Sequence, residues 1–216
     1  MILVPVKNLA NAKQRLAPVL EKSARTELAH AMLRDVLRAL ADYAEGEVSL
    51  VTSDPFAVEL ARDYRFGIIR DESNLSETDA IEMATRLCES WGIQSTLVIP
   101  ADIPLLEAAD IRTIYENTPE IGSVLVPSRD RRGTNAVRRR PAPLFPLRFG
   151  SDSFMPHLAA AIATNKSCVV LSLARIALDI DTPEDLRQLA HAPGERHSQL
   201  LARHFGLAEA PATVNS

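Results

Sequence analysis

Three basic side chains follow a short apolar segment near the start of the chain. The segment Ile2–Val6 leads to Lys7, and the loop that comes next contains Lys13 and Arg15. Cations and free backbone N–H groups at such a turn can hold a nucleoside triphosphate, because they match its charge and its oxygen acceptors. The loop is not a P-loop, since it lacks glycine and a Gly-Lys-Ser/Thr ending. A solvated surface loop is the alternative interpretation.

Aspartates follow two later apolar segments. Asp102 comes after a strand pattern that ends at Pro100, and Asp179 and Asp181 alternate with apolar residues, as on one face of a strand. Mg²⁺ takes hard oxygen ligands, typically one or two carboxylates together with phosphate oxygens and water. Any one of these aspartates is as well explained by a helix cap or a turn. Two such positions on the same sheet edge favour a magnesium site.

Two clusters of glycine and hydroxyl residues lie in an irregular stretch of the chain. They are the motifs GTNA at 133–136 and FGSDSF at 149–154. Such clusters can surround a phosphate or a carboxylate with N–H and O–H donors, although Ser151 or Asp152 could instead cap the following helix. No Ser–His–Asp or Cys–His arrangement is suggested, and only His157 of the five histidines is near a candidate site.

Apolar, β-branched segments alternate with helical patterns over most of the chain, and the strand segments are continuously apolar. Both features predict an α/β fold: a single Rossmann-like domain whose central, mostly parallel sheet carries helices on both faces. Ligands of such sheets bind beyond the carboxyl ends of the strands. The predicted strands are 2–6, 48–53, 67–70, 96–100, 123–127 and 169–173, and the predicted helices are 22–43, 55–64, 77–91, 107–117, 154–164 and 182–190.

The pattern predicts one domain over residues 1–206. Glycines and prolines interrupt the rhythm at about 129–152, which we interpret as an inserted loop or hairpin over the ligand edge, with 138–140 as a solvated strand end or loop. The small, polar residues 207–216 are predicted to form a disordered tail. In the helix 77–91, the apolar stripe is predicted to comprise Ile81, Ala84, Cys88 and Trp91.

Composition excludes several classes of protein. The chain has 216 residues, a net charge of −4 and 5% aromatic residues, which argues against binding of nucleic acid. No segment approaches the length of a membrane span. The two cysteines, Cys88 and Cys168, are not in metal-site spacing and are expected in the core, so a reducing cytoplasm is the expected location.

The order of these motifs resembles one family. The segments VPVK and AKQRL near the start, then IPADIPLL, GTNA, RFGSDSF and DIDTPEDL, resemble the CofC/FbiD guanylyltransferases of coenzyme F420 biosynthesis, a branch of the glycosyltransferase-A-like nucleotidyltransferases. The resemblance covers residues 2 to about 186. DIDTPEDL occurs in many nucleotidyltransferases, whereas GTNA followed by RFGxxSF is more specific.

The resemblance implies a reaction and a set of roles. GMP would pass from GTP to the phosphate of a three-carbon phospho-acid, with release of pyrophosphate, in an enzyme that is a homodimer. The acceptor would be 2-phospho-L-lactate, phosphoenolpyruvate or 3-phospho-D-glycerate. By the same resemblance, Lys7, Lys13 and Arg15 would hold phosphates, Asp102 and Asp181 would hold Mg²⁺, and the acceptor would contact Thr134, Gly150 and Ser153.

The chain also departs from the family pattern. The family's GLNxA-type segment is replaced at 75–80, which puts guanine recognition in doubt, and Ser151-Asp152 replaces a Pro-Gly pair. The Asp152 carboxylate could accept a hydrogen bond from a substrate hydroxyl, which slightly favours 3-phospho-D-glycerate. Another sugar- or acid-nucleotidyltransferase and a non-catalytic nucleotide-binding subunit are the alternatives.

Overall fold

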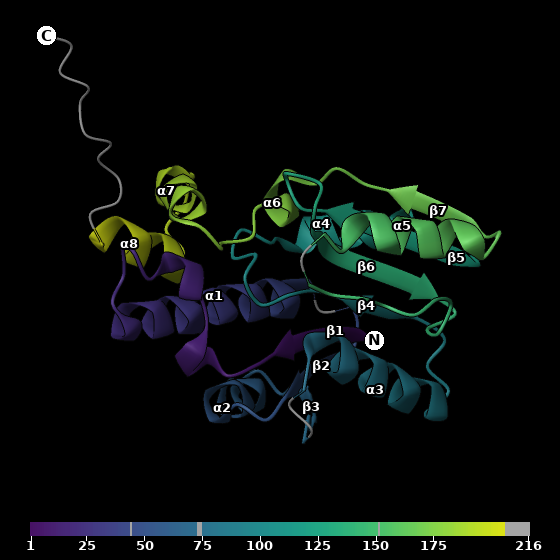
Figure 1. The fold of residues 1–216 in the computed structure, drawn as a ribbon. Helices are drawn as coiled ribbons and strands as arrows, with labels where there is room; N and C mark the ends of the chain where they lie inside the picture. The colour runs from purple at the N-terminus through teal and green to yellow at the C-terminus, as the bar shows by residue number, and fades with distance from the viewer. Residues whose placement is uncertain (44, 73–74, 151, 206–216) are drawn as a thin grey trace, which may run out of the picture.

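The computed structural model describes residues 1–43, 45–72, 75–150 and 152–205 (Figure 1). The predicted tail at 207–216 lies outside the described residues. Among the described residues, no helix is long and apolar enough to cross a membrane.

A seven-stranded sheet forms the centre of the protein, in the order β3-β2-β1-β4-β6-β5-β7. The pairs β1–β2, β1–β4, β2–β3 and β5–β7 are parallel, whereas β6 is antiparallel to both of its neighbours. The prediction of a mostly parallel sheet is therefore confirmed. The strands are β1 (Ile2–Val6), β2 (Val48–Thr52), β3 (Gly67–Ile69), β4 (Thr96–Val98), β5 (Gly122–Pro127), β6 (Thr134–Arg140) and β7 (Ser167–Val170).

Helices cover both faces of the sheet (Figure 1). Apolar residues of α1, α2 and α4 pack on one face, against alternate residues of β1, and those of α3 and α5 pack on the other. A third cluster joins α1 to α7 and α8. The helices are α1 (Lys22–Tyr43), α2 (Pro55–Asp63), α3 (Glu77–Ser90), α4 (Ala108–Glu116), α5 (Phe154–Ala163), α6 (Ala174–Ala177), α7 (Pro183–His191) and α8 (His197–His204), and two short 3₁₀ helices are η1 (Leu9–Asn11) and η2 (Gln14–Leu16).

Helix starts follow the capping residues in the sequence. Ser76 accepts a hydrogen bond from the backbone N–H of Asp79, and Thr182 accepts one from that of Asp185. These bonds satisfy N–H groups that have no partner inside the helix. The predicted inward-facing position of Trp91 is wrong: it follows the last residue of α3, and 55% of its surface is exposed.

The segment 129–152 is more than an inserted loop. Its residues Thr134–Arg140 form β6, which lies inside the sheet between β4 and β5. The prediction missed this strand because its second half carries three consecutive arginines. Because β6 runs opposite to β4, its first residue, Thr134, lies at the edge where the parallel strands end.

The interpretation of 138–140 as solvated is wrong for two of the three arginines. Arg139 is fully buried, and Arg138 is buried with its guanidinium 4.0 Å from the ring centre of Tyr115. Arg139 donates to the carbonyl of Phe145 and to Thr85 Oγ1, and it lies 3.5 Å from Glu82 Oε1. Burial lowers the pKa of Arg139 to about 10 despite the attraction of Glu82. Arg139 therefore joins β6 to α3 across the core.

We predict that Arg139→Met lowers the free energy of unfolding by about 3 kcal/mol, since it breaks a buried ion pair and two hydrogen bonds. Arg140→Met is the matched control: Arg140 is exposed, and its loss should cost less than about 0.5 kcal/mol. Urea unfolding of both variants provides the comparison. Equal midpoints for the two variants would contradict a structural role for Arg139.

Candidate active site

Two adjoining cavities lie at the edge of the sheet where β1 and β4 end. The larger has a volume of about 720 Å³ and the smaller about 390 Å³. Arg15, Glu77, Pro100, Asp102 and Asp181 line both of them. The smaller cavity also borders the loop after β1, and the larger extends to the start of β6 and of α5. The site can therefore accept two ligands that meet near the shared residues.

Lys13 lies at the boundary between these cavities. Its ammonium nitrogen is 2.7 Å from Asp102 Oδ2 and 2.9 Å from Asp181 Oδ1. Its backbone is left-handed, with φ of 55°, a conformation that costs energy for a residue other than glycine. Burial by itself lowers the pKa of Lys13, but the two carboxylates outweigh burial and raise it. The ammonium is therefore a fixed positive charge between two acidic residues.

The other two predicted cations, Lys7 and Arg15, also line the smaller cavity. Lys7 follows β1 and lines the smaller cavity, with its ammonium 3.6 Å from Asp71 Oδ2. Arg15 is mostly exposed and contacts Asp181 Oδ2 at 3.3 Å. All three cations predicted from the first loop thus lie at the cavities, and each is paired with at least one carboxylate.

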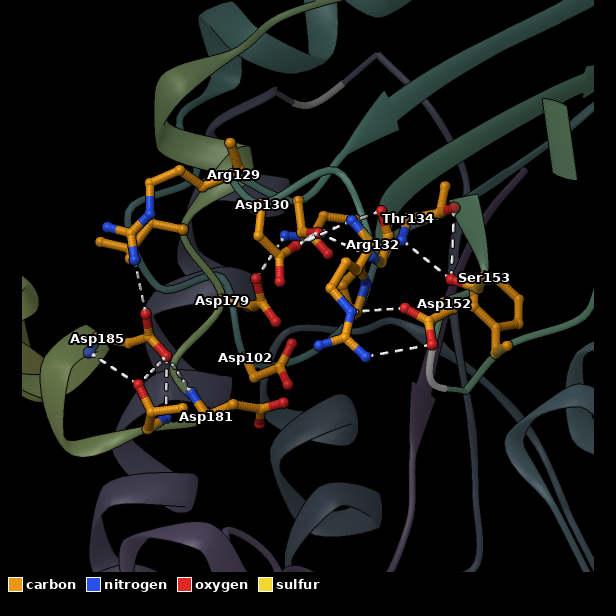
Figure 2. A pocket seen from close by; sticks show the side chains of 18 of the residues that line it. Asp102, Arg129, Asp130, Arg132, Thr134, Asp152, Ser153, Asp179, Asp181 and Asp185 are labelled. Carbon is orange, nitrogen blue, oxygen red and sulfur yellow. Dashed lines mark hydrogen bonds and ion pairs between the residues drawn. The ribbon is translucent and has the colours of Figure 1, made fainter. Parts of the chain in front are cut away.

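Asp179 and Asp181 of the DIDTPEDL motif lie in the connection between α6 and α7, not in a strand as predicted. The backbone N–H of Ile180 donates to the carbonyl of Asp102 at 3.0 Å, which places this segment beside the loop after β4 (Figure 2). Asp179 Oδ1 accepts a hydrogen bond from Asn135 Nδ2. The chain thus brings Asp102, Asp179 and Asp181 to the wall of one cavity.

The three aspartates differ in their electrostatic surroundings. Burial and then the charge of Asp102 raise the pKa of Asp179, whose hydrogen-bond partner among the described residues is the amide of Asn135 and not a cation. Burial also acts to raise the pKa of Asp181, but Lys13 outweighs it and the pKa is lowered. Within the described residues, no three acidic, histidine or cysteine side chains form a metal-binding group by themselves. A cation here would therefore need further oxygen ligands from its substrates.

Glu77 is a site residue that the sequence analysis did not identify. It is the first residue of α3, it lines both cavities, and its carboxylate makes no hydrogen bond or ion pair within the described residues. Burial, and then the charge of Asp102, raise its pKa to about 7. The feature of the sequence that could have identified Glu77 is its position in the segment 75–80, where the chain departs from the family pattern.

Residues of the two glycine–hydroxyl clusters meet at the other end of the larger cavity. The backbone N–H of Thr134 donates to Ser153 Oγ at 3.0 Å, and Gly150 lines the same wall. Asp152 also lies there, but both of its oxygens accept hydrogen bonds from Arg132 (Figure 2). Its φ of 58° is a conformation that favours glycine, which is the residue in the family pattern.

Comparison with known proteins identifies the family. Residues 1–214 match the model of the guanylyl transferase CofC-like family. The chain belongs to this family. It is thus a guanylyltransferase, an enzyme of the nucleotidyltransferase class, as the motifs predicted.

Relatives of the CofC-like family carry two different names. The chain is 36% identical to phosphoenolpyruvate guanylyltransferase of Rubrobacter xylanophilus, over 90% of this chain and 95% of that protein. It is 31% identical to 2-phospho-L-lactate guanylyltransferase of Methanothermobacter thermautotrophicus, over 93% and 89%. A solved structure from Desulfovibrio desulfuricans G20, described as a nucleotide-diphospho-sugar transferase, superposes with a TM-score of 0.75 at 18% identity, over 94% and 93%. This likeness supports the fold predicted from the sequence.

We predict that Lys13→Met lowers kcat/KM at least about 100-fold, because Asp102 and Asp181 lose the charge that holds them together. Lys22→Met, at the exposed start of α1, is the control and should retain normal kinetics. The rate of pyrophosphate release from GTP measures kcat/KM for both variants. Near-normal turnover of the Lys13 variant would remove Lys13 from the reaction.

Glu77 should make stability depend on pH. Its pKa is about 7 in the folded protein and 4.5 in the unfolded chain, so the folded state binds the proton more tightly. The free energy of unfolding should therefore fall as pH rises from about 4.5 to 7. Glu77→Gln keeps the neutral form and should exceed the original protein in stability by about 3 kcal/mol at pH 8, with no gain at pH 4.

Urea unfolding of the metal-free protein at both pH values measures this difference. Glu89→Gln, which is exposed on the same helix, is the control and should show no such change between the two pH values. A Glu77→Gln variant as stable as the original protein at pH 8 would show that the carboxylate is not destabilised there.

Proposed function

We propose that this enzyme transfers GMP from GTP to the phosphate of phosphoenolpyruvate, with release of pyrophosphate and with Mg²⁺ as cofactor. The observation that carries the proposal is the pair of cavities that share Asp102, Asp181 and Arg15. The transfer needs two anionic substrates to meet at one point, and this arrangement offers them separate cavities with a common wall. Membership of the guanylyltransferase family supports the same reaction.

In this proposal GTP occupies the smaller cavity. Lys7 and Arg15 border that cavity and can interact with its phosphates, while Lys13 orients the two aspartates. The acceptor occupies the larger cavity near Thr134, Gly150 and Ser153, where hydroxyl and backbone N–H groups are available. The cations reduce the repulsion between two anions, which is the main obstacle to their approach.

The acceptor's phosphate oxygen attacks the α-phosphorus of GTP in line with the leaving pyrophosphate. A P–O bond forms to the acceptor as the bond between the α-phosphorus and the bridging oxygen breaks. The attacking phosphate is already ionised near neutral pH, so no side chain has to remove a proton. The protein's contribution is thus to position the substrates and to stabilise charge.

The residues at the shared wall fit a magnesium ion. Asp102 and Asp181 each have carboxylate oxygens at the cavity, and carboxylates combined with phosphate oxygens are the usual Mg²⁺ ligands. Asp179 is a nearby carboxylate that has no cationic hydrogen-bond partner in the part of the chain that the structure describes, which also suits a binding site for a cation. Bound there, Mg²⁺ would stabilise negative charge on the phosphates. The proposed ligands are Asp102 and Asp181.

The choice of acceptor rests on two observations. The Rubrobacter relative, at 36% identity, is a phosphoenolpyruvate guanylyltransferase. Asp152 is the predicted partner for a hydroxyl of 3-phospho-D-glycerate, but its two carboxylate oxygens are paired with Arg132. Phosphoenolpyruvate has no hydroxyl and needs no such partner. The homodimer and the cytoplasmic location stay predictions.

The test is a competition among acceptors. We expect the enzyme, incubated with GTP, Mg²⁺ and equal amounts of phosphoenolpyruvate, 2-phospho-L-lactate and 3-phospho-D-glycerate, to give mainly the phosphoenolpyruvate adduct by mass spectrometry. A dominant product from another acceptor would overturn the choice of substrate, and no product at all would overturn the reaction. Asp102→Asn should abolish product formation while the far-UV circular dichroism spectrum stays unchanged, and EDTA should do the same.

A further inference from the structure

A buried histidine lies directly behind the proposed acceptor site. His157 is 1% exposed and lies on α5, four residues after Ser153, whose carbonyl accepts its backbone N–H. The ring of Phe149 packs edge-on against its imidazole, with ring centres 5.3 Å apart. The imidazole is thus held in one orientation by its own helix and by the loop before it.

The contacts of the ring determine which nitrogen carries the hydrogen. The backbone N–H of Arg148 donates to His157 Nε2 at 2.7 Å, so this nitrogen must present its lone pair. Burial, and then the charge of Arg139, lower the pKa of His157 to about 4, so the ring is neutral at physiological pH. The single hydrogen is therefore on Nδ1, which lies 2.9 Å from Thr134 Oγ1 and donates to it.

This donation affects the hydroxyl groups at the cavity wall. Thr134 Oγ1 accepts from His157, and Ser153 Oγ accepts from the backbone N–H of Thr134. The two hydroxyl oxygens are 3.4 Å apart, so at most one of their two hydrogens can lie between them. At least one hydroxyl hydrogen is then available to the cavity that both residues line. Because N–H groups already donate to both hydroxyl oxygens, the Thr134–Ser153 pair can act as an O–H donor toward the cavity.

We propose that His157 is a positioning residue that holds the Thr134–Ser153 hydroxyl pair as a hydrogen-bond donor toward an anionic group of the acceptor. The proposal rests on the function given above, because it assigns the acceptor to this cavity. A neutral imidazole suits this role, since it fixes the direction of the hydrogen bonds without adding a charge that would bind any anion. Hydrogen bonds in such a chain also strengthen one another.

Two substitutions test the roles of the two ring nitrogens of His157 separately. In His157→Asn, the side-chain amide can place an N–H where Nδ1 lies, whereas in His157→Gln the amide oxygen can replace Nε2 but no donor reaches Thr134. We expect His157→Gln to raise the KM for phosphoenolpyruvate about tenfold, with little change in the KM for GTP. His157→Asn should rescue most of this loss, within about threefold of the original KM.

A double-mutant cycle tests whether His157 acts through Thr134. Thr134→Val removes the hydroxyl at nearly constant volume, and in that background His157→Gln should change the acceptor KM less than about twofold. His191→Gln, on the exposed end of α7, is the matched histidine control. Equal losses for the Asn and Gln variants, or additive losses in the cycle, would reduce His157 to a core residue and overturn the proposal.

The tautomer can be measured without any substrate. Long-range ¹H–¹⁵N correlation spectra of the ¹⁵N-labelled full-length protein, assigned with His157→Gln, should show a hydrogen on Nδ1 and a lone pair on Nε2. The opposite tautomer, or an imidazolium near pH 7, would overturn the inference whichever acceptor is used. Absence of turnover with every acceptor would instead overturn the proposed function, and the tautomer spectrum would then decide the hydrogen-bond arrangement independently.

Discussion

The ammonium group of Lys13 connects the two parts of the site. Asp102 belongs to the loop after β4, and Asp181 to the segment between α6 and α7, far apart along the chain. Both carboxylates contact the same nitrogen, at 2.7 and 2.9 Å. Without this charge, two acidic groups could not stay close in a partly buried place. The position of the last helices relative to the sheet thus depends partly on this contact.

Charge at the site changes along the length of the two cavities. Lys7 and Arg15 border the side that suits a triphosphate, and the shared wall is acidic. The far wall, at Thr134 and Ser153, presents hydroxyl and N–H groups, and the charges of Asp152 and Arg132 beside it are paired with each other. Such an order suits a reaction between two anions, because the cations reduce repulsion where phosphates meet while the neutral groups select the shape of the acceptor. His157 lies behind the hydroxyl groups of that wall.

The buried arginine of β6 shows why a reversed strand matters here. Arg139 fixes β6 to α3, and β6 in turn delivers Thr134 to the same sheet edge as Asp102. A strand parallel to β4 would place its first residue at the opposite edge, far from the ligand. The antiparallel insertion is therefore the structural basis of the proposed acceptor site, and α3 places Glu77 on the wall that both cavities share.

The sequence by itself determined many of the helices and strands and the kind of chemistry, but neither β6 nor the irregular segment that carries Asp181. Periodicity predicted α1 at its observed bounds, and the ends of apolar segments indicated Lys7, Asp102 and Asp181, since both patterns depend on neighbouring residues. Only the tertiary structure decided that Lys13 pairs with two aspartates, that Arg139 is buried and that Thr134 meets Ser153 and His157. Those facts depend on which distant segments lie side by side, and burial then changes what a charged or polar group can do.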